Sequence, residues 1–574
     1  MERRVLVAIV LCFLVLYLWQ ALFVPPLEQP PAGSVATVPS TGATSPAVSV
    51  PAAPPPAVEA SGRSASALIS ETSEREVRLE TPRVVAVFTN RGARLKGWTL
   101  KSHRERDGQP VQLVVQAPEG AQPLPFSLAT DEEGITATVN SALYAVVDGV
   151  EPDTQARPPS VAFEYTDTAG LHVRKVFTLD PSSYTVDFRV SLTQGDSPIA
   201  SRIMWGPGLG DADAASGRSA VKPGGLYSAS GDVTRVAAAD SATTPASPMD
   251  FDYAGIEDQY FTALALKPGA ARIAYQPVSI PPTAGTEEPS RDLMAYSIET
   301  PKAAEGLTFY VGPKEFETLA AIDRNLVRAI NFGVFSVIVV PLLRSLNWIE
   351  GYVGNYGWAI VVLTAIINIV LFPLNHKSVV SMRKMQQIQP EAKAIQERYA
   401  KLKATDPARQ KMNQELMALY RERGVNPASG CVPILLTIPV FLAFYSLLTT
   451  AIELRGAPFV GWIQDLSASD PYYVMPVLVG LSQLWQQWLT PASGMDPTQQ
   501  KMMMIMPIVL IFVFVATPVG ALIYWFVGNV WRVGQQSLTN YLIGPPSIRS
   551  IRPPAERRVK RAASGKAESG SPEG

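Results

Sequence analysis

Hydrophobic and polar positions divide the chain into an apolar run near its start, a long region of alternating residues and an apolar C-terminal half. The first run, residues 5–24, has about 20 residues, the length that a helix needs to cross a bilayer. Arg3 and Arg4 precede it, which favours a cytoplasmic N-terminus. A cleaved signal peptide is the alternative, but the run is long for one and ends in PPLEQPP, without a cleavage pattern. We therefore expect an uncleaved transmembrane anchor over residues 1–24.

A linker and a β domain are predicted to follow this anchor. Residues 25–75 are rich in Pro, Ala, Ser, Thr and Val, a composition typical of an extended linker without a core. Between residues 76 and 313, segments such as VAFEYT, LHVRKVFTL and YTVDFRVSL alternate apolar and polar residues between the turn signals DTAG and DPSS. The pattern, with no convincing helix, predicts a large all-β sandwich outside the cytoplasm. Residues 206–247, rich in Gly, Ala and Ser, are expected to form an irregular insertion.

Residues 314–353 are predicted to lie along the outer membrane surface. The segment PKEFETLAAIDRNLVRAINFG has the spacing of an amphipathic helix. The apolar stretch FGVFSVIVVPLL after it has about 12 residues before Arg344, which is too short to span a bilayer. Trp348 and Glu350 follow closely, a combination that favours an interfacial helix.

Five further apolar segments predict a helical core over residues 354–541. The basic segment 375–427 carries eleven Lys and Arg residues against five Asp and Glu residues, and its pattern is helical with a break at ATDPA. Positive charge marks this segment and the basic tail, residues 542–574, as cytoplasmic. The charges thus favour six spans with both termini inside the cell. The five core spans are expected at about 354–374, 430–452, 472–489, 502–518 and 520–541.

The overall composition hides this division, since 47% of residues are hydrophobic, 17% are charged and the formal net charge is −1. The chain lacks a nucleotide-binding P-loop, a G-x-S-x-G elbow and an H-E-x-x-H pair. Its three histidines are scattered, and the predicted spans contain no pair of acidic residues. We therefore expect no catalytic residue, metal, cofactor or small-molecule substrate. A proton-coupled transporter or intramembrane protease would place ionisable groups in the spans.

Neutral polar residues interrupt three of the predicted spans at helical spacing. The segment TAIINIVLFPL places two of them four residues apart, on one face of the second span. Interhelical hydrogen bonds at roughly 1 kcal/mol each are one explanation. The alternative is a hydrated groove open to the cytoplasm and partly to lipid. The candidate groove residues are Thr364, Asn368, Gln483, Gln487, Trp525, Asn529, Arg532 and Gln536.

Arg532 is the one basic residue in this polar set. It lies about eleven residues into the last span, ~16 Å from its start at 1.5 Å per residue. A charge at that depth costs a few kcal/mol unless it faces water or protein. Snorkelling to the cytoplasmic interface beside Trp531 is the alternative to a position in the groove.

Several ordered motifs resemble those of the YidC/Oxa family of membrane protein insertases. They are VNPASGCVPILLTIPVFLAFYSLL, DLSASDPYYVMPVLVG, EDQYFTALAL and YVGPKEF, together with the pair Gln535–Gln536. The resemblance covers nearly the whole chain apart from the linker and the tail. It implies a periplasmic β-supersandwich and five core helices around a groove, in the bacterial inner membrane. It also implies that the protein inserts and folds nascent membrane proteins, alone or with the Sec translocon and its accessory subunits.

The resemblance also places one departure in the groove. The family pattern T-x-x-x-R before Pro-Leu aligns its threonine with Thr364 and its arginine with Asn368. The groove aromatic pair of the last span aligns with Tyr524 and Trp525. Our hypothesis is that Arg532 supplies the missing positive charge from the opposite wall.

Basic residues outside the spans suggest further partners, ribosomal RNA or anionic lipid, which charge alone does not separate. A short basic tail is equally typical of a plain topology signal. A periplasmic assembly scaffold anchored by its spans is the alternative function, although an anchor has no need of polar faces. The candidate ribosome or targeting contacts are Arg383, Lys384, Arg557, Arg558 and Lys560.

Overall fold

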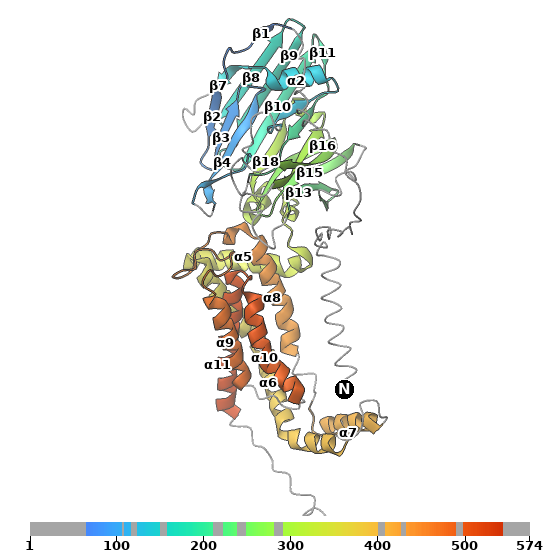
Figure 1. Cartoon of the computed structure of the whole chain (residues 1–574), viewed down its shortest axis with the longest axis vertical. Coiled ribbons are helices and arrows are strands. Elements are labelled where there is room, and N and C mark those ends of the chain that lie inside the picture. Colours follow the sequence, from blue (N-terminus) through green and yellow to red (C-terminus); the bar gives the residue numbers. More distant parts are fainter. Residues whose placement is uncertain are drawn as a thin grey trace, which may run out of the picture.

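A β domain stands at one end of a helical bundle, and a helical hairpin projects from the opposite end (Figure 1). The predicted anchor 1–24 and Arg557, Arg558 and Lys560 of the tail lie outside the described residues. The computed structural model describes residues 65–105, 108–115, 123–149, 158–210, 222–237, 248–280, 291–399, 408–425, 432–489 and 497–543.

The β domain consists of two antiparallel sheets. The central path of the larger, 14-stranded sheet runs β1 (Ala67–Ile69), β8 (Ser160–Asp167), β9 (Leu171–Leu179), β10 (Thr185–Gln194), β18 (Leu307–Pro313), β16 (Phe261–Ile280), β15 (Met249–Glu257), β13 (Gly224–Ala229) and β14 (Asp232–Val236). The strands β6 (Ser127–Ala129), β7 (Ala145–Gly149), β11 (Ser197–Pro198), β12 (Arg202–Trp205) and β17 (Arg291–Glu299) pair beside it. The 4-stranded sheet has the order β2 (Glu76–Glu80), β3 (Val84–Thr89), β4 (Arg94–Arg104) and β5 (Pro110–Gln112).

The three strands expected from alternation are present. VAFEYT lies in β8, LHVRKVFTL forms β9, and most of YTVDFRVSL lies in β10. They pair consecutively, with Phe177 of β9 opposite Phe188 of β10. Inward-facing residues of β9 and β10 are buried and alternate with more exposed ones, as a half-buried sheet requires.

Aromatic side chains fill the space between the sheets. Phe88 of β3 lies 4.5 Å from Phe177 of β9, measured between ring centroids. Phe126 contacts Trp205 and Phe309 at centroid distances of 5.5 and 5.0 Å. The indole nitrogen of the buried Trp98 donates to the carbonyl of Val311 at 2.9 Å, so the smaller sheet is hydrogen-bonded to β18. The two sheets therefore share one core.

A lysine is fully buried in this core. The Lys175 amine donates to the carbonyls of Gly92 and Phe126, at 2.7 and 2.8 Å, and more weakly to that of Ala93, at 3.3 Å. Burial lowers the pKa of Lys175 well below its ordinary value of 10.5. The amine therefore joins β9 to the turn before β4 and the loop before β6.

A Lys175→Met substitution is expected to destabilise the β domain. It keeps most of the side-chain volume but leaves buried carbonyls without a donor, at roughly 1–3 kcal/mol for each one that water cannot reach. The free energy of opening, from hydrogen exchange of β9 and β10 amides, measures the loss. Lys96→Met removes an exposed pair with Glu76 (2.7 Å) and is expected to change this free energy by less than about 1 kcal/mol. Equal effects of the two substitutions would contradict the prediction.

Three features of the β domain differ from the expectation. The helices α2 (Glu133–Ser141) and α3 (Lys302–Glu305) interrupt a region in which no helix was expected. The sequence of α2, EGITATVNS, is rich in β-branched residues, which disfavour a helix locally. Strand β1 pairs with β8 inside the predicted linker 25–75. The supposed irregular insertion contains the hairpin β13–β14, whose turn residues Ser230 and Gly231 both have positive φ.

The connection from the β domain to the bundle is also less regular than expected. The predicted amphipathic helix is divided into α4 (Phe316–Ile322) and two 3₁₀ turns, Leu326–Ala329 and Gly333–Phe335. The break follows from Asp323, whose carboxylate accepts the backbone N–H of Asn325 at 2.9 Å. Helix α5 (Ser336–Val353) then lies across the end of the bundle nearest the β domain (Figure 1).

The bundle contains helices at all five expected core segments. They are α6 (Tyr356–Arg398), α8 (Val432–Thr450), α9 (Val474–Leu489), α10 (Pro497–Phe514) and α11 (Val519–Ile543). Helix α11 packs against α6, α8 and α9, α10 packs against α9, and α5 packs against α6 and α8. Helix α6 continues beyond the expected span and forms the hairpin with α7 (Ala408–Glu422).

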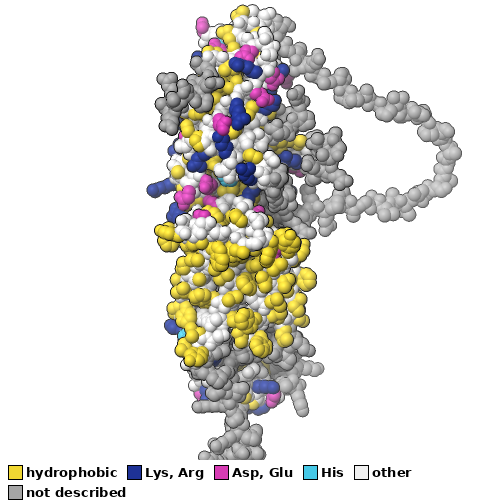
Figure 2. All heavy atoms as spheres, turned by 90° about the vertical axis from the view of Figure 1, so that its left-hand side faces the viewer, with side chains coloured by type: hydrophobic (Ala, Val, Ile, Leu, Met, Phe, Trp, Pro, Cys, Tyr) yellow, Lys and Arg dark blue, Asp and Glu magenta, His cyan; other side chains and the backbone are white. Residues whose placement is uncertain are grey.

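The outer surface of the bundle is apolar. Figure 2 shows hydrophobic side chains over the bundle, whereas charged ones lie over the β domain above it. Within the described residues, two helical segments, Gly333–Val353 and Tyr356–Met385, have the length and hydropathy of a membrane span. The first is longer than the 12-residue stretch considered from sequence, because the helix continues through Arg344. Exposed apolar side chains of this surface include Trp358, Ile369, Val370, Leu481, Trp485, Trp488, Phe512 and Val513.

Candidate functional site

The polar pair of α6 is buried in the bundle. Thr364 is 0% exposed and Asn368 is 7% exposed. The Thr364 hydroxyl donates to the Ile360 carbonyl at 2.6 Å, and the Asn368 amide donates to the Thr364 carbonyl at 2.8 Å. Both side chains therefore bond to their own helix, one turn earlier, while they present polar atoms to the interior.

A second polar group connects α9 with α11. Asn529 is 0% exposed and donates to the Ser482 hydroxyl at 2.9 Å, which in turn donates to the Val479 carbonyl at 2.8 Å. The Arg532 guanidinium donates to the side-chain oxygen of Asn529 at 3.2 Å. We call Ser482, Asn529 and Arg532 the polar chain. Asn529 uses both ends of its amide, so its orientation is fixed between the two helices.

The Arg532 side chain turns back toward the start of α11. A terminal guanidinium nitrogen lies 3.5 Å from the position that a Cβ atom on Gly528 would take. This direction is the one that helical side chains prefer, and it leads away from the C-terminal end of α11. Because Gly528 has no side chain, the guanidinium has room to lie beside it. The side chain therefore does not extend toward the C-terminal end of α11, as snorkelling beside Trp531 would require.

The two aromatic candidates of α11 have different surroundings. Trp525 contacts Phe441 of α8 and Phe514 of α10 at centroid distances of 4.6 and 5.3 Å, and its indole nitrogen donates to Gln483 at 3.4 Å. Tyr524 is 6% exposed and stacks on Phe444 of α8 at 4.4 Å. Trp525 therefore lies between α8, α9 and α10, whereas Tyr524 belongs to the α8–α11 contact.

The remaining candidates are partly buried, and two polar residues were missed as site members. Gln487 and Gln536 are partly buried on α9 and α11. Gln535 is 6% exposed, and its amide reaches the Phe372 carbonyl of α6 at 3.5 Å. Ser482 and Gln535 were visible as polar interruptions of apolar spans, but helical spacing alone does not identify the helix that each one faces.

The hairpin of α6 and α7 places the two basic candidates differently. Arg383 is 7% exposed, against the expectation of an exposed ribosome contact, whereas Lys384 is exposed. The positive charge of both residues is evident from the sequence. Which face of α6 is covered by neighbouring segments is not evident from it. Ion pairs Arg398–Glu415 and Arg423–Glu391, each 3.0 Å long, connect the two helices of the hairpin.

In the part of the chain that the structure describes, no group of three or more His, Cys, Asp or Glu residues could hold a metal ion. A cavity of about 210 Å³ lies between the β domain and the loop after α8, away from the polar chain. Its lining consists of Ser102, His103, Arg104, Phe261, Arg455 and Gly456.

Comparison with known proteins agrees with this two-part organisation. Residues 76–345 match the family described as YidC periplasmic domain, and residues 348–544 match the family described as 60Kd inner membrane protein. The membrane protein insertase YidC of Geobacter metallireducens is 33% identical over 94% of this chain and 98% of its own length. The corresponding protein of Oleidesulfovibrio alaskensis is 34% identical over 93% and 98%. A crystal structure of an active YidC insertase aligns at 20% identity over 82% of this chain and 94% of its own, with a TM-score of 0.35.

The β domain, the apolar bundle and these matches define an inner-membrane protein with a large extramembrane domain. The family is identified by two family matches that together cover most of the chain. Relatives that are about one third identical over nearly all of the chain support the same assignment. The chain belongs to the YidC family of membrane protein insertases.

Proposed function

We propose that this protein inserts and folds proteins of the bacterial inner membrane through a hydrated groove lined by the polar faces of α6, α9 and α11. The observation that carries the proposal is the polar chain, in which buried Ser482 and Asn529 join a partly buried Arg532 inside a bundle whose outer surface is apolar. Thr364 and Asn368 add polar atoms from α6, which packs against the same helix α11. An arginine at this depth of the bundle costs free energy unless its guanidinium contacts polar partners.

The groove lowers the free-energy cost of the unfavourable step of insertion, the passage of the substrate's polar flank. The apolar segment of a nascent protein enters hydrocarbon favourably, since each Leu or Ile contributes about −0.3 to −0.6 kcal/mol at mid-membrane. Its polar flank must also cross, and every unpaired backbone group costs several kcal/mol there. Amide and hydroxyl groups of the groove give that flank hydrogen-bond partners, and Arg532 attracts an acidic flank. The step needs no hydrolysis, which agrees with the missing nucleotide motif.

The proposed orientation places the β domain in the periplasm and the hairpin and both termini in the cytoplasm. Five bundle helices and the N-terminal anchor cross the membrane, and α5 lies along its outer surface. Exposed Trp348, Tyr352, Trp462 and Tyr472 near the β domain suit the outer membrane–water interface. The excess of basic residues between α6 and α8 suits the cytoplasmic side.

Further partners follow from the same orientation. Lys384, which is exposed, and the basic tail residues Arg557, Arg558 and Lys560 supply positive charge that ribosomal RNA or anionic lipid would attract. The Sec translocon and its accessory subunits would share substrates with the bundle from within the membrane. No small-molecule substrate is required.

Liposomes that contain only this protein test the function directly. A single-span substrate with a short polar flank is expected to yield a protease-protected fragment in these liposomes and not in empty ones. The ratio of protected fragment between the two preparations is the measurement. Failure of the purified protein, with insertion after addition of the Sec translocon, would show that insertion depends on partners. Failure in both cases would favour an assembly scaffold.

A further inference from the structure

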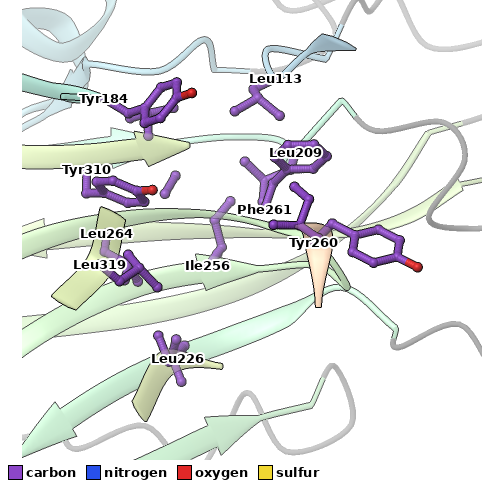
Figure 3. Packing of buried hydrophobic residues seen from close by; sticks show 14 of the residues in the cluster. Leu113, Tyr184, Leu209, Leu226, Ile256, Tyr260, Phe261, Leu264, Tyr310 and Leu319 are labelled. Carbon is purple, nitrogen blue, oxygen red and sulfur yellow. The ribbon is translucent and has the colours of Figure 1, made fainter. Parts of the chain in front are cut away.

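The β domain and the bundle meet in a joint built from motifs that the proposed groove does not use. Gln259, in the segment EDQYF, donates its amide to the carbonyl of Thr449 near the end of α8, at 2.7 Å. The Arg455 guanidinium lies 4.9 and 5.5 Å from the ring centroids of Tyr260 and Phe261. Figure 3 shows these two rings on the loop and strand that follow Glu257. The joint therefore ties the start of β16 to the outer end of α8.

A carboxyl group completes this joint from the bundle side. Glu453 lies in the 3₁₀ turn Ile452–Leu454, directly after α8. Its Oε1 atom accepts the backbone N–H of Phe316, the first residue of α4, at 3.0 Å. The side chain thus caps α4, which has no capping hydrogen bond from its own N-cap residue Glu315.

The second oxygen of Glu453 has no such partner. Its Oε2 atom is buried and forms no hydrogen bond within the described residues. Among the same residues, no Lys, Arg or His forms an ion pair with Glu453, because Arg455 directs its guanidinium to the rings of Tyr260 and Phe261. A buried carboxylate oxygen without a donor favours the protonated, neutral form of the group.

The neighbouring carboxylates act in the same direction. Glu315 and Glu317, at the start of α4, repel a negative charge on Glu453. Glu350 of α5 and Tyr356 of α6 lie within electrostatic range of the same cluster. On the other side, the Arg344 guanidinium lies 5.1 Å from the Phe316 ring, and His103 lies near Glu315 and Arg455. Burial raises the pKa of Glu453 from 4.5 to about 7; the backbone N–H groups of Glu453 and Phe316 act against this increase, and the two α4 carboxylates add to it.

We propose that Glu453 is a positioning residue whose protonation sets how firmly α4, and with it the β domain, is held on the outer end of α8. The neutral carboxyl fits the closed joint, whereas an ionised carboxylate draws water in and loosens it. Because the closed-state pKa is raised, this stabilisation is full below the ordinary pKa of 4.5 and is lost as the pH rises to about 7. The proposal goes beyond insertion, since its readout involves no substrate.

Hydrogen exchange of the full-length protein in lipid nanodiscs tests the proposal. Protection of the segment from Lys314 to Ile322, corrected for intrinsic rates, is measured between about pH 5 and pH 8. Wild-type protection is expected to fall by up to about tenfold per pH unit and to level off near pH 7. Glu453→Gln, which keeps the oxygen acceptor and cannot ionise, is expected to show protection independent of pH.

Glu317→Gln provides the matched control, because Glu317 is exposed and acts on the joint only through its charge. This variant is expected to keep the pH dependence but to reach the level of low protection at a lower pH than the wild type, because the loss of repulsion by Glu317 lowers the pKa of Glu453. A flat wild-type profile would overturn the proposal without any variant. An equal slope in wild type and Glu453→Gln, with unchanged protection of β16 as the check on folding, would also overturn it.

Discussion

A Glu257→Gln variant is expected to lose about 3–5 kcal/mol of β-domain stability, the usual cost of breaking a buried ion pair from one side. Glu257 is 4% exposed and pairs with Lys314 at 3.1 Å and with Arg235 at 2.7 Å. The Lys314 amine also donates to the Asp258 carbonyl at 2.6 Å, and Arg235 donates to the Ala329 carbonyl at 2.8 Å. Removing the carboxylate leaves the 3%-exposed Lys314 as an uncompensated buried charge.

Hydrogen exchange of β15 and β18 amides in the full-length protein measures this loss. Glu76→Gln serves as the control, because Glu76 pairs with Lys96 on an exposed surface, where such pairs contribute about 0–1 kcal/mol. A double variant, Glu257→Gln with Lys314→Met, is expected to recover part of the loss, since it removes the stranded charge. A Glu257→Gln loss below about 1 kcal/mol would contradict the prediction.

Replacing Arg532 with leucine is expected to reduce insertion of a substrate with an acidic flank roughly 10- to 100-fold, which corresponds to losing one charge-assisted contact of about 1.5–3 kcal/mol. The guanidinium is partly buried and donates a hydrogen bond to Asn529, so its attraction for a substrate carboxylate is screened less than it would be in bulk water. Adding Asn368→Arg restores a charge from α6 and is expected to recover insertion. The protease-protected fraction in liposomes containing only the purified protein measures both effects.

Two comparisons separate charge from packing at this position. Arg532→Lys retains the charge and is expected to insert the acidic substrate better than Arg532→Leu. A substrate with a neutral flank is expected to be affected less by Arg532→Leu than the acidic one. If Arg532→Leu inserts the acidic substrate as fast as the wild type does, the neutral polar residues suffice and the arginine charge is not used.

Long periodic segments were predictable from the sequence, and local exceptions were not. Alternation identified β8, β9 and β10 because each has one buried face, and apolar length identified the five bundle helices. The short helix α2 escaped because its β-branched residues favour a strand locally, while its position is set by packing against β6. The hairpin β13–β14 was not predicted because the Gly, Ser and Ala residues of β13, GGLYSA, resemble those of a loop.

The candidate site was predictable only to the level of single helices. Spacing placed Asn529 and Arg532 on one face of α11, and the structure adds Ser482 of α9 as the partner of Asn529. The role of Glu453 was not predicted from the sequence, because a lone acidic residue beside an apolar span is ordinarily an exposed residue of a loop. Its burial depends on α4, which lies more than a hundred residues earlier in the chain. Contacts between distant segments of this kind have no local signal.

Helix α6 is one continuous element of 43 residues, about 65 Å long at 1.5 Å per residue. It contains both the buried pair Thr364 and Asn368 and, beyond Pro373, the helix of the hairpin. Proline lacks a backbone N–H, so Pro373 and Pro390 each remove one hydrogen bond from this helix, which continues through both of them. A large particle that docks on the hairpin would therefore act on a lever, and a small tilt at the docking end would displace the polar pair without passing through any flexible loop.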